Sequence, residues 1–196
     1  MERSRRSVLL SVPPLWLIGV CLFLPTVRAC ERMETPASLI RGGPVLFSGM
    51  LAPYLFAELL AILCIVALAR HRLTPFLRRA TLAAVALSGA SACVLTYMSF
   101  FPESNHTEQQ WGVFDLACIA AAVAAVWRAR RAGEWTRQAR ALVAFTFLTL
   151  PMAVFLARIG ITDGPRHLGY GAWPLFAAVV ALCAIHVRDL VPSSSA

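Results

Sequence analysis

Charge is scarce in this sequence, and lysine is absent from it. Charged residues make up 14% of the 196 residues, against roughly 25% in an average soluble protein, and hydrophobic residues make up 59% against roughly 45–50%. A soluble fold of this size needs more charge to cover its surface. The composition therefore excludes an ordinary soluble domain and favours a chain whose solvent is lipid.

Metal-binding and disulfide motifs are missing as well. The six cysteines form no Cys-x-x-Cys and no Cys/His cluster with zinc spacing. All but Cys30 lie inside apolar runs, where a thiol behaves as a small hydrophobic side chain. We predict no metal and no cofactor. The formal net charge of +8 does not indicate a nucleic-acid partner, because the arginines form short clusters between apolar runs rather than one patch.

Several apolar segments approach the length of about 20 residues that a helix needs to cross a bilayer. They are residues 8–25, 46–69, 80–101, 111–127, 141–157 and 171–187. A basic leader, residues 1–7, precedes them, and a short polar tail, residues 188–196, follows. The chain is predicted to be all-α, a single transmembrane domain in which about six spans form a polytopic bundle with short loops.

The arginines are distributed unevenly between alternate loops. Thirteen of the 18 lie in the leader, in the loops after the second and fourth segments, and just after the sixth segment. Short loops rich in arginine remain on the cytoplasmic side of a membrane. We therefore predict that both termini are cytoplasmic.

The first segment admits a second interpretation. The basic leader, the apolar stretch and the tripeptide Val-Arg-Ala at 27–29 also resemble a secretory signal peptide with a small-residue cleavage site. Cleavage after Ala29 would leave five spans and an external N-terminus, with every remaining loop on the same side. We expect the segment to be retained, because it is longer than the about 7–15 residues of a signal core.

Glu58, near the middle of the second segment, is the most informative polar residue. An ionised carboxylate at this depth costs a few kcal/mol, so by default it is protonated, paired or facing a polar cavity. Tyr54 lies one turn away on the same helical face. Two interpretations stay open. Glu58 and Tyr54 form a proton or substrate site, or Glu58 is a neutral carboxyl that hydrogen-bonds to another helix.

Other charged residues are predicted at the membrane surfaces. Asp115 in the fourth segment and Arg158 at the end of the fifth are expected near the outer surface, as an ion pair or as two snorkelling side chains. The loop after the fourth segment is predicted to contact anionic lipid head groups on the cytoplasmic side. Its basic residues are Arg128, Arg130, Arg131, Arg137 and Arg140.

No catalytic constellation is apparent in the sequence. Ser88 and Ser91 together with His186 suggest an intramembrane serine protease of the rhomboid family, but the Gly-x-Ser-Gly motif is absent. His186 is also expected at the cytoplasmic end, away from both serines, and a nucleophile needs its base within hydrogen-bond reach. Haem is disfavoured because the other histidines fall in arginine-rich or polar loops rather than inside helices.

The segment 22–36, with Leu-Phe-Leu-Pro followed by Cys30 and Pro36, resembles small, uncharacterised multi-span proteins of the bacterial inner membrane. This resemblance implies an inner-membrane location and no particular activity. For function we expect a non-enzymatic membrane scaffold or a subunit of a larger assembly, with another membrane protein as its partner. The alternatives are a small proton-coupled carrier centred on Glu58 and, least favoured, a membrane-embedded enzyme.

Overall fold

The computed structural model describes residues 2–24, 27–29, 32–35, 52–100, 106–162 and 169–190, and these are almost entirely helical. The α-helices in them are α1 (Glu2–Val20), α4 (Ala52–Ala69), α5 (Pro75–Ser99), α6 (His106–Ala129), α7 (Glu134–Thr162) and α8 (Ala172–Leu190). The 3-10 turn η1 (Cys21–Phe23) follows α1 directly. The predicted helical class is confirmed, and each apolar segment overlaps one of the six helices.

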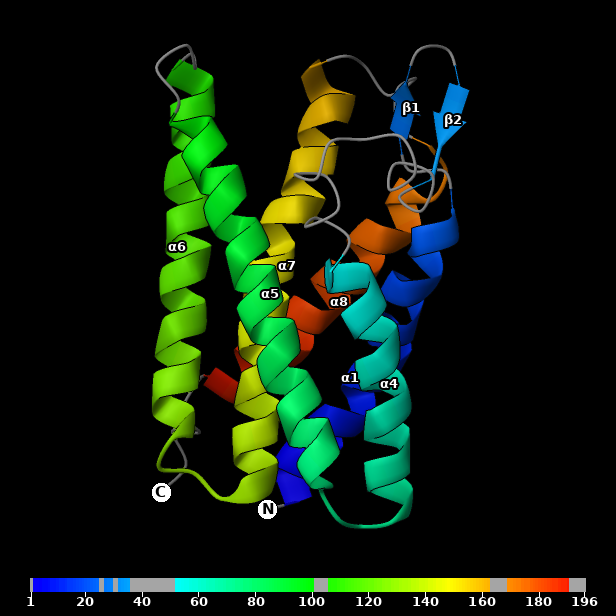
Figure 1. Cartoon of the computed structure of the whole chain (residues 1–196), viewed down its shortest axis with the longest axis vertical. Helices are drawn as coiled ribbons and strands as arrows, with labels where there is room; N and C mark the ends of the chain where they lie inside the picture. The colour runs from blue at the N-terminus through cyan, green and yellow to red at the C-terminus, as the bar shows by residue number, and fades with distance from the viewer. Residues whose placement is uncertain are drawn as a thin grey trace.

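Two short strands were not predicted. Strand β1 (Val27–Ala29) pairs antiparallel with β2 (Arg32–Glu34), so that Arg28 lies opposite Met33. They lie at the end of the bundle opposite the N-terminus (Figure 1). The helices also differ in extent from the apolar segments, because α1 begins inside the basic leader and α7 begins at Glu134, before its apolar run.

Helix length and composition meet the requirements for membrane crossing in two helices. Within the described residues these stretches are Pro75–Tyr97 of α5 and Gln109–Ala129 of α6. Shorter apolar stretches occupy Tyr54–Ala69 of α4 and Ala172–His186 of α8.

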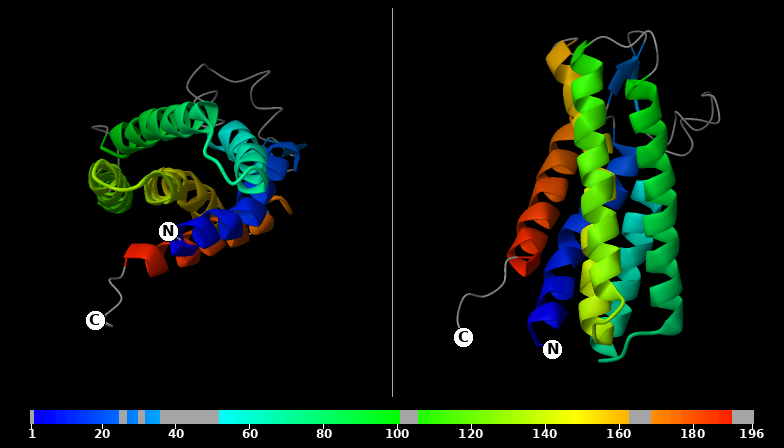
Figure 2. Two further views of the ribbon diagram at one scale, coloured as in Figure 1. Left: turned by 90° about the horizontal axis from the view of Figure 1, so that it is seen from below. Right: turned by 90° about the vertical axis from the view of Figure 1, so that its left-hand side faces the viewer.

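Helix α7 lies at the centre of the bundle and contacts α1, α5, α6 and α8 (Figures 1 and 2). Every side chain from Ala141 to Thr146 is buried, as expected for a helix that has neighbours on all sides. Helix α6 lies at one edge of the bundle against α5 and α7, whereas α4 and α8 both pack beside α1. Helix α7 therefore contacts helices from both the N-terminal and the C-terminal parts of the chain.

The interior consists of two apolar clusters. The larger one joins α1, α4, α5, α7 and α8 and includes Leu15, Leu60 and Phe145. The smaller one, where α6 packs on α5 and α7, is mostly alanine, including Ala92, Ala122, Ala125 and Ala144. Small side chains at this contact allow the helix backbones to approach each other closely.

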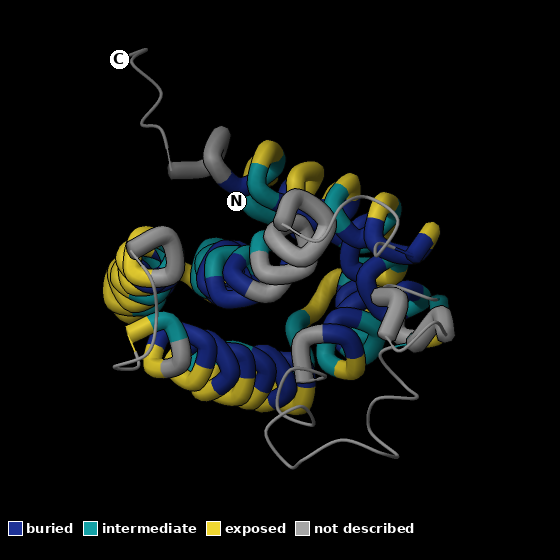
Figure 3. Tube along the Cα trace, turned by 90° about the horizontal axis from the view of Figure 1, so that it is seen from above, coloured by how far each residue is buried: buried dark blue, intermediate teal, exposed yellow. Residues whose placement is uncertain are grey.

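The outward faces of the helices are also apolar. Figure 3 shows exposed positions along the outside of the bundle. On α6, Val113, Val123 and Trp127 are 60%, 62% and 66% exposed, and large exposed apolar side chains also occur on α1, α4, α5 and α8. Large areas of exposed apolar surface are rare on soluble monomers and commonly mark a surface that another medium or molecule covers.

The arginine-rich segments lie together in space. The start of α1, the α4–α5 turn and the α6–α7 turn are all at one end of the bundle (Figure 1). Arg5 connects two of them, because its Nη2 is hydrogen-bonded to His71 Nδ1 and donates to the carbonyl oxygen of Leu68 at 3.4 Å. His71 itself has φ 52°, a left-handed backbone conformation that ends α4 and lets the chain turn into α5.

Candidate functional site

Glu58 lies in α4 where this helix contacts α1, and its side chain is half-buried. A Cβ atom at Gly19 of α1 would be only 2.6 Å from the Cβ of Glu58, so the two helices approach closely because residue 19 is glycine. Among the described residues the Glu58 carboxyl group has no hydrogen-bond or ion-pair partner. Tyr54, one turn away, is 3% exposed and belongs to the larger apolar cluster. The structure therefore places both residues at the α1–α4 contact.

Asp115 is buried in α6, with 6% of its surface exposed. Arg158 belongs to α7, but its side chain lies outside the part of the structure that is described. The ion pair between Asp115 and Arg158 therefore stays a prediction.

The five arginines predicted to contact lipid have different surroundings. Arg128, Arg130 and Arg131 are exposed, whereas Arg137 and Arg140 are half-buried. Arg140 Nη1 donates to the carbonyl oxygen of Arg128, and Arg137 Nη2 donates to that of Ala132 at 3.2 Å. Arg140 thus satisfies a carbonyl group in the last turn of α6, and Arg137 satisfies one in the turn between α6 and α7.

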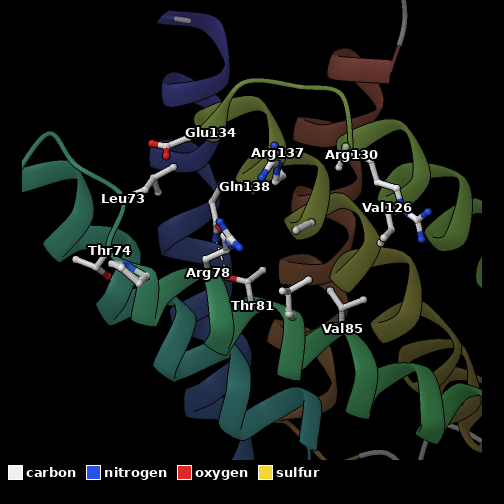
Figure 4. A pocket seen from close by; sticks show the side chains of 14 residues that line it. Leu73, Thr74, Arg78, Thr81, Val85, Val126, Arg130, Glu134, Arg137 and Gln138 are labelled. Atoms are coloured by element: carbon white, nitrogen blue, oxygen red, sulfur yellow. Dashed lines mark hydrogen bonds between the residues drawn. The ribbon is translucent and has the colours of Figure 1, made fainter.

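A pocket of about 500 Å³ opens between α5, α6 and α7 at the arginine-rich end (Figure 4). Arg78 of α5, Arg130 of the α6–α7 turn and Arg137 of α7 line it, together with Glu134 and Gln138. The structure thus joins two of the five predicted lipid-contact arginines with one from the preceding basic loop. The sequence contains no pattern that associates Arg78 with them.

A buried hydrogen bond links α5 and α7 at this pocket. Gln138 Nε2 donates to Thr81 Oγ1 at 2.7 Å, and Thr81 Oγ1 donates in turn to the carbonyl oxygen of Leu77 at 2.8 Å. Both side chains are almost completely buried, and both line the pocket. The Nε atom of Arg137 is also buried, and it has no hydrogen-bond partner among the described residues.

A second buried polar pair joins α1 and α8. Ser11 Oγ lies 3.2 Å from His186 Nε2 and donates to the carbonyl oxygen of Ser7 at 2.8 Å. Since the single hydroxyl proton is used in this helical bond, His186 Nε2 is the donor to Ser11. An activated serine nucleophile requires the opposite direction, with the histidine accepting the proton. The sequence signal that could have suggested this pair is the four-residue spacing of Ser7, at the end of the basic leader, and Ser11, in the first apolar segment.

Ser88 and Ser91 lie in α5, whereas Ser11, which lies close to His186, belongs to α1. Ser91 Oγ donates to the carbonyl oxygen of Leu87 at 3.2 Å. Ser88 Oγ is buried and has no hydrogen-bond partner among the described residues. The described residues contain no group of three or more His, Cys, Asp or Glu side chains that could hold a metal ion.

Comparison with known proteins gives no family for this chain. No protein-family model, no curated protein and no solved structure matches it.

Proposed function

We propose that the protein is a non-enzymatic integral membrane protein of six spans, which acts as a scaffold or as a subunit of a larger assembly. Both termini are cytoplasmic, and the membrane is the inner membrane of a bacterium. The observation that carries this proposal is the apolar outer surface of the helices, since large hydrophobic side chains are exposed on α1, α4, α5, α6 and α8. Contact between lipid chains and such a surface costs no free energy, whereas contact between water and an apolar surface does.

Helix length supports the number of spans. The shortest helix, α4, has 18 residues, and the longest, α7, has 29. At about 1.5 Å per residue, 18 residues extend over about 27 Å, close to the roughly 30 Å of a bilayer core. The gathering of the arginine-rich segments at one end supports cytoplasmic termini.

Reporter fusions test this topology. Green fluorescent protein fused after Arg72, after Ala132 or at the C-terminus is expected to be fluorescent, because these sites are assigned to the cytoplasm. Alkaline phosphatase fused after residue 104 is expected to be active outside. The reverse pattern, or release of the protein from membranes by carbonate, would contradict the proposal.

The outer face of α6 supports a role in an assembly. Ala117, Ala120 and Ala124 are exposed along this edge helix, and small residues allow another helix to pack closely. A photo-crosslinking amino acid at Ala120 is therefore expected to form a discrete protein adduct in native membranes. The same amino acid at exposed Val180 of α8 is the matched control, expected to give lipid adducts alone. Lipid adducts at both positions would argue against a partner on α6.

A second candidate, a proton-coupled carrier centred on Glu58, is favoured by the half-buried carboxyl group without a partner among the described residues. It predicts pH-dependent carbodiimide labelling of Glu58 in the purified protein in lipid, located by mass spectrometry. It also predicts that Glu58→Gln leaves folding intact and abolishes flux. Exposed Glu134 is the internal control. Labelling of Glu134 while Glu58 stays unmodified at every pH would exclude the carrier.

A further inference from the structure

The pocket between α5, α6 and α7 has a net positive lining. Arg78, Arg130 and Arg137 reach it from different helices or turns, and Glu134 is the acidic residue among its lining. In Figure 4, Glu134 lies on one side near Leu73, and Arg130 lies on the other side near Val126. Three arginine residues in the lining of one cavity of this size favour an anion, and arginine matches the geometry of phosphate oxygens.

The same lining becomes apolar with distance from the end of the bundle. On α5 it changes from Arg78 to Val85, over roughly 10 Å of helix, and on α6 from Arg130 to Val126, over roughly 6 Å. On α7 the lining ends at Ala141. The three walls of the pocket thus change from charged to apolar in the same direction. A ligand that fits them has an anionic end and a hydrocarbon end.

The guanidinium group of Arg137 has unused hydrogen-bonding capacity. Its Nη2 donates to the carbonyl oxygen of Ala132 at 3.2 Å, but its buried Nε has no partner among the described residues. A buried charged donor without an acceptor costs free energy. A phosphate oxygen bound beside Arg137 would supply that acceptor.

We propose that this pocket is a specific site for one anionic phospholipid. The phosphate lies among Arg78, Arg130 and Arg137, and the acyl chains leave along Leu82, Val85 and Val126 into the bilayer. The volume of about 500 Å³ holds a head group and the first part of the chains. This inference rests on the proposed membrane topology, in which the pocket opens at the level of the cytoplasmic head groups. It goes beyond general attraction between basic loops and an anionic membrane, because it requires particular arginines.

Native mass spectrometry of the purified full chain in non-ionic detergent tests the ligand class. The probes are dioctanoyl phosphatidylglycerol, dioctanoyl phosphatidylcholine and glycerol 3-phosphate. We expect one equivalent of phosphatidylglycerol to bind, and the other two to bind about tenfold more weakly or less, since one lacks net charge and the other lacks chains. Equal binding of phosphatidylcholine would overturn the charge requirement. Equal binding of glycerol 3-phosphate would identify a free phosphate compound and overturn the lipid.

Matched arginine pairs test the site itself. Arg78→Gln with Arg130→Gln removes two positive charges from the pocket, whereas Arg79→Gln with Arg131→Gln removes two exposed charges from the adjacent positions, which do not line it. We expect phosphatidylglycerol to bind about tenfold more weakly to the first variant and within about twofold of the original affinity to the second. Equal losses in both variants would show general electrostatic attraction and overturn the site.

Circular dichroism of each variant shows whether its helices are intact. The lipid inference and the proposed topology fail separately. A protein that passes the fusion and carbonate tests but binds no phosphatidylglycerol refutes the lipid site alone. A protein that carbonate releases from membranes refutes the topology, whatever it binds in detergent.

Discussion

The contact between Gly19 and Glu58 gives the sharpest prediction for stability. In Gly19→Ala, the new Cβ would lie 2.6 Å from the Cβ of Glu58 and 3.1 and 3.2 Å from its Cα and backbone nitrogen. Carbon atoms in contact are normally about 3.5–4.0 Å apart. Because the obstructing atoms belong to the backbone and to Cβ, no side-chain rotation relieves the overlap. Helices α1 and α4 must therefore separate by about 1 Å.

The magnitude follows from two opposing terms. Overpacking of this kind costs about 1–3 kcal/mol, whereas replacing glycine by alanine inside a helix gains about 1 kcal/mol. The variant is expected to lose up to about 2 kcal/mol, which for a protein of this size lowers Tm by up to about 8 °C. The matched control is Gly89→Ala, whose Cβ would meet Leu148 Cδ1 at 3.7 Å, an ordinary van der Waals contact. This control is expected to raise Tm by about 2–4 °C.

Thermal unfolding in detergent, followed by circular dichroism, measures both variants. A third variant, Gly19→Ala with Glu58→Gly, removes the Cβ atom that causes the overlap. It should be more stable than the sum of the two single changes predicts, with a coupling of at least about 1 kcal/mol. Glu58→Gln keeps its Cβ atom and should not rescue Gly19→Ala. The same Tm shift for Gly19→Ala and Gly89→Ala would refute the close approach of α1 and α4.

Two buried hydrogen bonds give further predictions in the same assay. Gln138→Leu removes the donor to Thr81 and should cost only about 1 kcal/mol, because the Thr81 hydroxyl keeps its bond within α5. Ser11→Ala removes the acceptor that the Ser11 hydroxyl provides for buried His186 Nε2 and should cost about 1–3 kcal/mol. Ser7→Ala removes only a bond within its own helix and should cost less. A Ser11→Ala variant as stable as Ser7→Ala would contradict the role assigned to this pair.

For the residues that the structure describes, hydropathy predicted the order and approximate positions of the helices, but not their ends. Apolar runs indicate where a chain avoids water, whereas helical hydrogen bonds continue into charged residues. Helix α7 accordingly begins at Glu134, where an acidic side chain interacts favourably with the helix dipole. Strands β1 and β2 have three residues each, too few for an alternating pattern to be recognised.

The candidate sites required knowledge of which helices are neighbours. The distribution of arginines predicted a basic end, and the position of Glu58 inside an apolar segment singled it out. The pocket, however, combines Arg78 with Arg137 because α5 packs on α7. In the same way, Ser11 meets His186 because the first and last helices lie side by side. The apolar runs of a single sequence show where its helices lie. They contain no pattern that shows which helices pack against each other.

The buried hydroxyl groups of Thr81 and Ser11 each take part in one hydrogen bond within their own helix and one with another helix, and this has a consequence for biosynthesis. Thr81 and Gln138 are 57 residues apart, and Ser11 and His186 are 175 residues apart. At about 5–20 residues per second, the ribosome supplies the second partner about 3–11 s and about 9–35 s after the first. During this interval the hydroxyl donors of Thr81 and Ser11 are already bonded to carbonyl groups of their own helices. In the proposed topology, each early helix can therefore enter the bilayer before its later partner exists, without an unsatisfied hydroxyl donor at these positions.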